Sequence, residues 1–206
     1  MRIVTISREF GSGGRELGKR LADLLQWDYY DSEIISAVAQ KCGQNPQAVE
    51  QLLEHHGWQQ FPVTYRGSIG STAYLQSSQV DLLLKQKSVL EEIASLGKDC
   101  IIVGRNADVI LNAYDPLNLF VCAQMDARIR RCMERAAAGE NLGEKDLRKK
   151  ILQIDKMRSR TREILTGSPW GQPEAYHLTV NTTAWPVKAL VAPTATFIES
   201  FFRRNL

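Results

Sequence analysis

The sequence predicts an α/β fold in which one parallel β-sheet lies between two layers of helices, a three-layer arrangement. Short apolar runs typical of buried strands alternate with longer segments of helical periodicity along the whole chain. The first apolar run passes directly into a glycine-rich turn and then into a helical pattern. With 206 residues, of which 44% are hydrophobic and 24% charged, the chain suits one compact domain over residues 1–206.

The strand, turn and helix at the start of the chain form its most informative stretch. Residues 3–6 are a β-branched run, and residues 11–14 contain three glycines that permit a tight turn. Leu17 and Leu21 then begin the helical pattern. The N–H groups of a helix's first turn and the positive end of its dipole converge on whatever lies in such a loop. The stretch therefore predicts a phosphate-binding loop.

This loop departs from the pattern G-x-x-x-x-G-K-[ST], whose lysine contacts the β- and γ-phosphates and whose hydroxyl binds magnesium. With Gly13 aligned to the second glycine, Arg8 stands at the first glycine, Gly14 at the lysine and Arg15 at the hydroxyl. Taken alone, the loop fits a plain strand-to-helix turn as well as it fits a phosphate site. The rest of the chain favours the phosphate site.

The other elements follow in alternation. Further strands are expected at about residues 29–30, 100–103, 117–122 and 176–180. Helices are expected at about residues 33–41, 80–94, 107–111, 126–138 and 145–165, with a closing helix from Pro186 that Pro193 should kink or split. Residues 43–78 are the least regular part and predict an excursion from the core, in which Tyr65 and Arg66 are either substrate contacts or solvated loop residues.

Polar residues follow two of the predicted strands directly. Asp31 and Ser32 come after the second strand, where they either cap the next helix or face a ligand. Arg105 and Asn106 follow the apolar run 100–103 and a glycine. Arginine is a planar, bidentate donor suited to phosphate, although a surface arginine paired with a carboxylate would fit the same position.

Two neighbouring helices carry basic stripes at i, i+3, i+7 spacing, on either side of a glycine break at residues 139–143. The stripes consist of Arg128, Arg131 and Arg135 on the first helix, and of Asp155, Arg158 and Arg162 on the second. Such stripes are either solvated faces crossed by ion pairs or, beside a phosphate loop, a lid that closes on phosphates.

Composition excludes several classes of protein. A net charge of +3 does not indicate nucleic-acid binding, and acidic residues interrupt the basic stretch 126–162. No signal peptide and no membrane-spanning run is recognisable, so a cytoplasmic protein without a membrane partner is expected. The four cysteines form no C-x-x-C pair and the three histidines have no ligand spacing, which predicts reduced thiols and no zinc site.

Taken together, these segments resemble the cytidylate kinase-like branch of the nucleoside monophosphate kinases over nearly the whole chain. The matching segments are residues 4–25 (strand, phosphate loop and helix), 29–32, 102–106 (the family's Asp-Gly-Arg-Asp), 126–131 (the helix into the lid), Asp155 with Arg158 and Arg162, and 178–182. The resemblance implies the nucleoside monophosphate kinase type of fold, with an acceptor-binding insertion at about 43–78 and an arginine-rich helical lid at about 126–165.

The resemblance also implies transfer of the ATP γ-phosphate, with magnesium, to a nucleoside monophosphate, CMP or dCMP first. A small-molecule nucleotide is the implied partner. The implied site residues are Gly11, Ser12, Gly13, Gly14 and Arg15 for the ATP phosphates, Asp31, Ser32, Arg105, Asn106 and Asp155 for the acceptor, and Arg15, Arg131, Arg158 and Arg162 for charge neutralisation during transfer. The magnesium ligands and the oligomeric state stay unassigned.

Two functions are compatible with this pattern. The lid arginines favour an active kinase, because a protein that only binds nucleotide has little use for transition-state neutralisation. The missing lysine and hydroxyl, together with Val103 and Asn106 in place of the two acids of Asp-Gly-Arg-Asp, favour a nucleotide-binding regulatory protein that keeps the fold without transfer.

Overall fold

The computed structural model describes residues 1–43, 45–47, 69–135, 143–167 and 169–204, with the backbone alone over residues 69–80. Its centre is a parallel sheet of five strands in the order β2-β3-β1-β4-β5. The strands are β1 (Ile3–Arg8), β2 (Asp28–Tyr30), β3 (Cys100–Val103), β4 (Leu117–Cys122) and β5 (Leu178–Asn181). The central strand β1 is buried throughout, as its β-branched run predicts.

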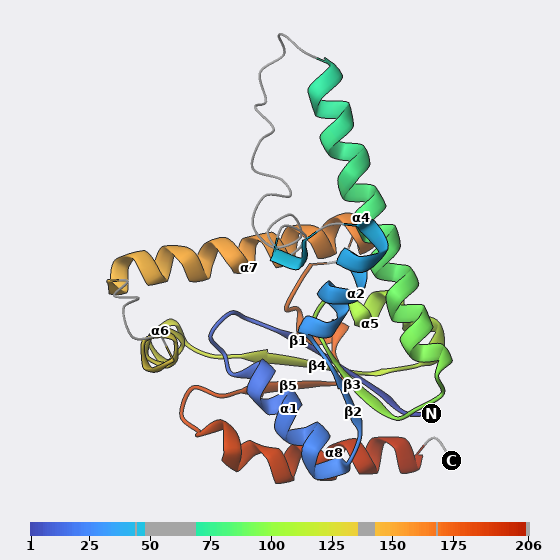
Figure 1. Cartoon of the computed structure of the whole chain (residues 1–206). Helices are drawn as coiled ribbons and strands as arrows, with labels where there is room; N and C mark the ends of the chain where they lie inside the picture. Colours follow the sequence, from blue (N-terminus) through green and yellow to red (C-terminus); the bar gives the residue numbers. More distant parts are fainter. Residues whose placement is uncertain (44, 48–68, 136–142, 168, 205–206) are drawn as a thin grey trace.

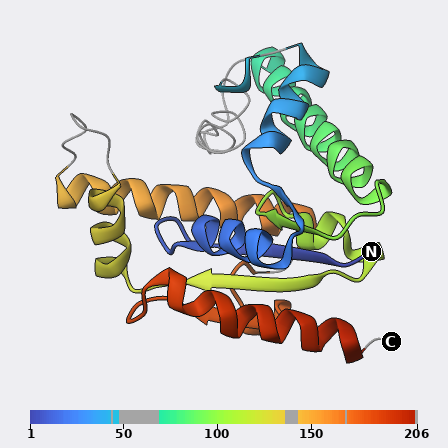
Figure 2. The same cartoon turned by 60° about the horizontal axis from the view of Figure 1, so that its bottom comes forward.

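Helices cover both faces of the sheet, which confirms the predicted three-layer α/β fold (Figures 1 and 2). The helices are α1 (Gly14–Leu25), α2 (Ser32–Cys42), α4 (Ile69–Ser95), α5 (Ala107–Ile110), α6 (Met125–Glu134), α7 (Glu144–Thr166) and α8 (Val191–Arg204). Short 3₁₀ turns lie at Asn112–Tyr114, Pro173–Ala175 and Val187–Leu190. Among the described residues, no helix is both long enough and apolar enough to cross a membrane.

The hydrophobic core has two halves, one on each face of the sheet. On one face, Val4, Ile6 and Val121 pack with α1 and α8. On the other, Ile3 and Ile102 pack with α2, α4 and α5. Alternate residues of the strands serve alternate halves, so the sheet is buried on both sides and its orientation is fixed.

Because all strands are parallel, the segments that leave their carboxyl ends gather at one edge of the sheet. Arg8 ends β1, Asp31 follows β2, residues 104–106 follow β3 and Thr182 follows β5. This edge is where ligands bind in open α/β sheets. The helix α7 lies beside it, and its contacts are described below.

Several element boundaries differ from those predicted. The helix α4 begins at Ile69 rather than near residue 80, and its amino-terminal part extends away from the sheet (Figure 1). The serine and glutamine residues in 71–79 are typical of a loop but are also compatible with a helix. The last strand begins at Leu178, two residues later than expected. The rest of the predicted excursion, including Tyr65 and Arg66, lies outside the described residues.

The closing segment is split ahead of Pro193, as predicted. A 3₁₀ turn covers Val187–Leu190 and passes into α8 at Val191, so Pro193 lies in the first turn of α8. There its missing N–H has no intrahelical partner to lose.

Candidate functional site

The glycine loop joins the end of β1 to α1 in a conformation held by buried hydrogen bonds. Gly11 and Gly13 have φ angles of 77° and 87°, which strongly favour glycine. The Ser12 side chain is fully buried, and its hydroxyl donates to the carbonyl of Glu9 at 2.9 Å. In this arrangement α1 begins directly at the loop, so the N–H groups of its first turn face the loop as in an anion site.

Thr182, the residue after β5, and Arg131 of α6 together hold the loop from one side. The buried Thr182 hydroxyl donates to the carbonyl of Ser12 at 2.6 Å and accepts from Arg131 Nη1 at 2.9 Å. Arg131 also donates to the carbonyl of Ser12 at 3.4 Å. Burial, followed by the charges of the neighbouring Arg130 and Arg135, lowers the pKa of Arg131.

Helices α6 and α7 fix the loop from the other side through Arg128 and Asp155. Arg128 Nε donates to the carbonyl of Phe10 at 2.7 Å, and Asp155 accepts from the N–H of Phe10 at 2.8 Å. Arg128 and Asp155 also form a buried ion pair with each other, and Glu9 lies 3.4 Å from Arg128. Both backbone polar groups of Phe10 are therefore bonded to side chains of the region predicted to form a lid.

The buried Asp31 forms a second cluster with two arginines of the loop region, the buried Arg8 and the exposed Arg15. Its side chain pairs with Arg15 of α1 and lies 3.8 Å from Arg8 Nη2. It occupies the N-cap position of α2 but makes no capping hydrogen bond, so helix capping does not account for it. The neighbouring Tyr29 hydroxyl donates to the carbonyl of Arg15 at 3.4 Å, and burial, then the charge of Asp31, raises the pKa of Tyr29 and keeps it neutral.

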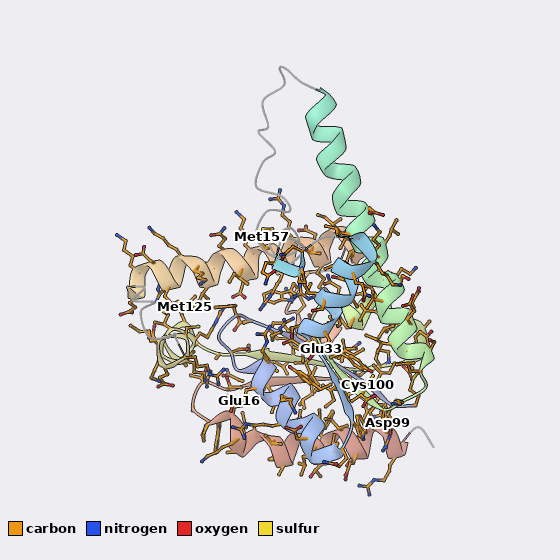
Figure 3. The ribbon with its side chains drawn as sticks, in the orientation of Figure 1. Glu16, Glu33, Asp99, Cys100, Met125 and Met157 are labelled. Carbon is orange, nitrogen blue, oxygen red and sulfur yellow. The ribbon has the colours of Figure 1, made fainter. Side chains whose placement is uncertain are left out.

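A cleft opens beside the loop, between the ends of β1 and β3 and the helices α4 and α7. Its space is about 580 Å³, counting the open part at the mouth. It is lined by three arginines (Arg8, Arg105 and Arg158), five other polar or small residues (Ser7, Gln86, Gly104, Asn106 and Thr161) and four apolar ones (Leu83, Ile154, Met157 and Trp170). Figure 3 shows Met157 on α7, above the sheet. None of the described residues that line the cleft is acidic, which favours an anionic guest.

Arg105 and Arg158 reach the cleft from different elements. Arg105 has a φ of 60°, and its carbonyl accepts from the side chain of Gln86 at 2.8 Å, which ties the end of β3 to α4. Arg158 of α7 donates to the carbonyl of Arg8 at 3.0 Å and lies over the ring of Phe10. Asn106, with a φ of 52°, completes the turn after β3.

Arg162 lies one turn after Arg158 on α7, but its side chain has different neighbours. It forms a buried ion pair with Asp108 of α5 and lies over the ring of Tyr176, 5.2 Å from its centre. It is not among the residues that line the cleft. Ser32, the first residue of α2, is exposed at the same edge of the sheet.

The loop offers no evident protein ligands for magnesium. Its hydroxyl, that of Ser12, is bonded to the backbone, and position 15 carries a guanidinium. The nearby carboxylates of Glu9, Asp31 and Asp155 are each bonded to an arginine or to backbone N–H groups. No group of three metal-ligating side chains occurs among the described residues. A divalent ion that accompanies a nucleotide would therefore be held by its phosphates and by water.

Sequence reasoning selected most of this edge but missed several residues. Thr182 and Gln86 were not selected, Arg128 was named only as part of a basic stripe, and Arg8 only as an alternative to Arg15 for reaching the phosphates; all four contact the loop or the cleft. Thr182 could have been found from its place directly after the last strand, since the carboxyl ends of parallel strands share one edge. The partners of Arg128 and Gln86 are 118 and 19 residues away in the sequence and leave no local signal.

A family model and a known relative both match the part of the chain that forms this edge. The model of the cytidylate kinase-like family matches residues 3–184, from β1 to just beyond β5. A cytidylate kinase from Haloarcula marismortui is 22% identical over 200 residues, which cover 97% of this chain and 90% of that protein.

Solved structures share the fold at low identity. An uncharacterized protein from Eubacterium ventriosum is similar with a TM-score of 0.68 and 23% identity, over 97% of this chain and 99% of the other. A shikimate kinase from Acinetobacter baumannii, in complex with shikimate, is similar with a TM-score of 0.55 and 15% identity, over 97% and 94% of the two chains. These similarities establish the fold. The family match begins at β1, includes the glycine loop and ends just beyond β5. The chain belongs to the cytidylate kinase-like family.

Proposed function

We propose that this protein is an ATP-dependent phosphotransferase that moves the γ-phosphate of ATP to a nucleoside monophosphate, with CMP and dCMP as the first candidates. The cleft lined by Arg8, Arg105 and Arg158 beside the glycine loop carries this proposal. Three guanidinium groups line one cleft, and one of them belongs to the strand that leads into the glycine loop, which supports binding of phosphates there.

The donor site of the proposal is the loop from Gly11 to Arg15. Phosphate oxygens would accept from the N–H groups of the first turn of α1, with the dipole of that helix adding to the attraction. Arg131 and Thr182 fix the carbonyl of Ser12 away from that position. A loop held in this way needs little rearrangement to bind phosphate, which lowers the entropic cost of binding.

The acceptor site of the proposal is the cleft. Arg105 and Arg158 would bind the acceptor's phosphate, while Leu83, Met157 and Trp170 offer apolar surface to its base and sugar. Asn106 lies in the same lining, and Asp31 and Ser32 stand at the neighbouring strand end. A phosphate bound here lies beside the donor loop, as an in-line transfer requires.

Transfer in this proposal depends on positioning and charge neutralisation. An oxygen of the acceptor phosphate attacks the γ-phosphorus, the bond from that phosphorus to the bridging oxygen breaks, and ADP leaves with the electron pair. Arg15, Arg131 and Arg158 neutralise the charge, and α7, which contacts Arg8 and Phe10, acts as part of the lid. Asp155 contributes by holding the loop.

A coupled assay of ADP release tests the proposal, with CMP, dCMP, UMP, AMP and shikimate as acceptors. We expect a pyrimidine monophosphate to raise the rate above that of ATP alone. Arg105→Ala should raise the KM of the acceptor by about tenfold or more and change the KM of ATP little, because a charged hydrogen bond is lost on one side only. The matched control is Arg203→Ala, in an exposed ion pair on α8.

A second function is favoured by the departures at positions 14 and 15. If no acceptor raises ADP release while calorimetry still detects ATP binding, the protein is a nucleotide-binding regulator that keeps the kinase fold. Arg15 stands where the pattern has the magnesium-binding hydroxyl and pairs with Asp31, which favours this second function because a guanidinium cannot bind magnesium.

A further inference from the structure

We propose that Arg8 supplies, from the end of β1, the positive charge that faces the transferring phosphate, which the pattern G-x-x-x-x-G-K-[ST] assigns to a lysine at the position of Gly14. The proposal rests on the function proposed above and adds one catalytic residue to it. The departures at positions 8 and 14 are then one reciprocal exchange: the cation lies on the strand at Arg8, and the helix begins with glycine at position 14.

The first observation is that the side chain of Arg8 leaves no room for one at position 14. A Cβ on Gly14 would lie 2.6 Å from Arg8 Cβ, 3.1 Å from Arg8 Cγ and 3.3 Å from Val121 Cβ. Gly14 is the first residue of α1, where the backbone accepts any residue, so packing is what requires glycine there. A side chain at position 8 and a side chain at position 14 therefore exclude each other in this backbone, and Arg8 takes the shared space.

The second observation is the course of the Arg8 side chain. Arg8 Nη1 lies only 1.4 Å from the position that a Cβ on Gly104 would take, so the guanidinium fills the space over that glycine. Arg8 lines the cleft together with Arg105 and Arg158, although its backbone belongs to the strand that enters the loop. Its charge therefore lies in the proposed acceptor cleft, on the strand that leads into the proposed donor loop.

The third observation concerns how this buried charge is held. Arg8 is only 8% exposed, its carbonyl accepts from Arg158, and Asp31 lies 3.8 Å from its Nη2 atom. Asp31 is itself 2% exposed and shares its charge with Arg15. A guanidinium fixed in a water-poor site acts strongly on a nearby phosphate, because the surroundings screen it weakly. Arg8 forms and breaks no covalent bond in the transfer.

The packing part of the proposal is tested by thermal unfolding. Gly14→Ala should lower the Tm of the parent protein, and it should lower the Tm much less in an Arg8→Gly background, where the obstructing carbons are absent. The matched control is Gly143→Ala, because Gly143 has a φ of −63° and a Cβ there would have no atom closer than 4.0 Å. Equal losses of Tm for Gly14→Ala in both backgrounds would refute the exchange.

The chemical part is tested by calorimetric titration of ATP and of ADP, which differ by the phosphate that is transferred. Arg8→Gly should weaken ATP binding by about tenfold to a hundredfold, the effect of one charged hydrogen bond, and ADP binding far less. Arg8→Gly with Gly14→Lys should restore the preference for ATP. If the glycine variant does not fold, Arg8→Gln serves for the comparison of ATP with ADP only, because glutamine keeps the Cβ and Cγ that obstruct position 14.

Two results would overturn the proposal: equal weakening of ATP and ADP, or no recovery in a folded Arg8→Gly/Gly14→Lys protein. Neither result depends on turnover. Absence of ADP release with every acceptor would contradict the proposed function, whereas the ratio of ATP to ADP affinity would still decide the role of Arg8.

Discussion

Asp155 of α7 accepts a hydrogen bond from the backbone N–H of Phe10 at 2.8 Å and at the same time pairs with Arg128 of α6. The residue therefore links the glycine loop to two helices of the region predicted to form a lid. Sequence analysis assigned Asp155 to the acceptor site, and the structure shows a carboxylate already bonded on the loop side. Its proposed role is to hold the loop in the conformation that binds phosphate.

Asp155→Ala should lower the free energy of unfolding by about 3 kcal/mol, because the buried Arg128 loses its closer carboxylate partner and keeps Glu9 at 3.4 Å. Asp155→Asn keeps an acceptor for the N–H of Phe10 and should retain more ATP affinity than the alanine variant. Urea unfolding and ATP calorimetry measure the two effects. Glu163→Gln, on the exposed side of the same helix, is the control and should change neither. Unchanged ATP affinity in a folded Asp155→Ala protein would remove Asp155 from the loop's support.

Thr182→Val tests the support of the loop from the side of β5. Valine matches the shape of threonine but cannot donate to the carbonyl of Ser12 or accept from Arg131. We expect a loss of about 1–3 kcal/mol in stability and a weaker affinity for ATP, because the Ser12 carbonyl and Arg131 Nη1 each lose their shorter hydrogen bond and keep the 3.4 Å one to each other. Thr182→Ser keeps the hydroxyl and should recover the affinity. If serine and valine give the same ATP affinity, the hydroxyl has no part in nucleotide binding.

Arg162→Ala and Arg158→Ala should separate structural from catalytic arginines on α7. Arg162 is paired with Asp108 in the interior, so its removal should cost about 3–5 kcal/mol of stability. Arg158 lines the cleft, so its removal should lower kcat with a smaller loss of stability. In a double-mutant cycle, Asp108→Ala with Arg162→Ala should lose much less than the sum of the single changes. Additive losses would mean that Arg162 acts independently of Asp108, as expected if it contacts the transferring phosphate.

A pH-dependent contribution to stability is expected at the opposite edge of the sheet, where Figure 3 shows Asp99 and Cys100 before and at the start of β3. Burial raises the pKa of Asp99, but hydrogen bonds from the Arg2 N–H at 2.6 Å and Nε at 2.8 Å outweigh it. The pKa of folded Asp99 therefore lies below its ordinary 3.8. The contribution is present above that ordinary value and is lost as the pH falls through the lower, folded value.

Asp99→Asn should accordingly lower stability by about 1 kcal/mol or less at pH 7, since the pair is partly exposed. The difference from the parent protein should shrink in acid. Urea unfolding at a series of pH values measures it, with Asp115→Asn, an exposed carboxylate before β4, as the control. A difference that stays constant into acid would contradict the assigned cause.

The sheet and its functional edge could be predicted because they rest on local patterns. Short, largely apolar runs define β1, β3 and β4, and parallel strands bring their following residues to one edge. The start of α4 was predicted wrongly, because the composition of residues 69–79 suits both a loop and a helix. Tertiary packing decides between loop and helix here, and local composition does not reveal that packing.

The basic stripe of α6 shows where pattern reasoning ends. Helical spacing places Arg128, Arg131 and Arg135 on one face, as predicted, but it does not identify their partners. In the structure they bond to three different parts of the molecule: Arg128 to Phe10 and Asp155, Arg131 to Ser12 and Thr182, and Arg135 to Glu16 of α1. These partners are 27 to 119 residues away, and only the fold brings them together.

The close approach of Gly14 to Arg8 has a consequence for how relatives of this chain are sought in genomes. A sequence pattern that requires a lysine at the first residue of this helix misses every protein in which, as here, a side chain on the strand leaves room only for glycine. A pattern that requires an arginine on the strand whenever the helix begins with glycine would retrieve such proteins. It would also separate them from chains in which neither position carries a cation.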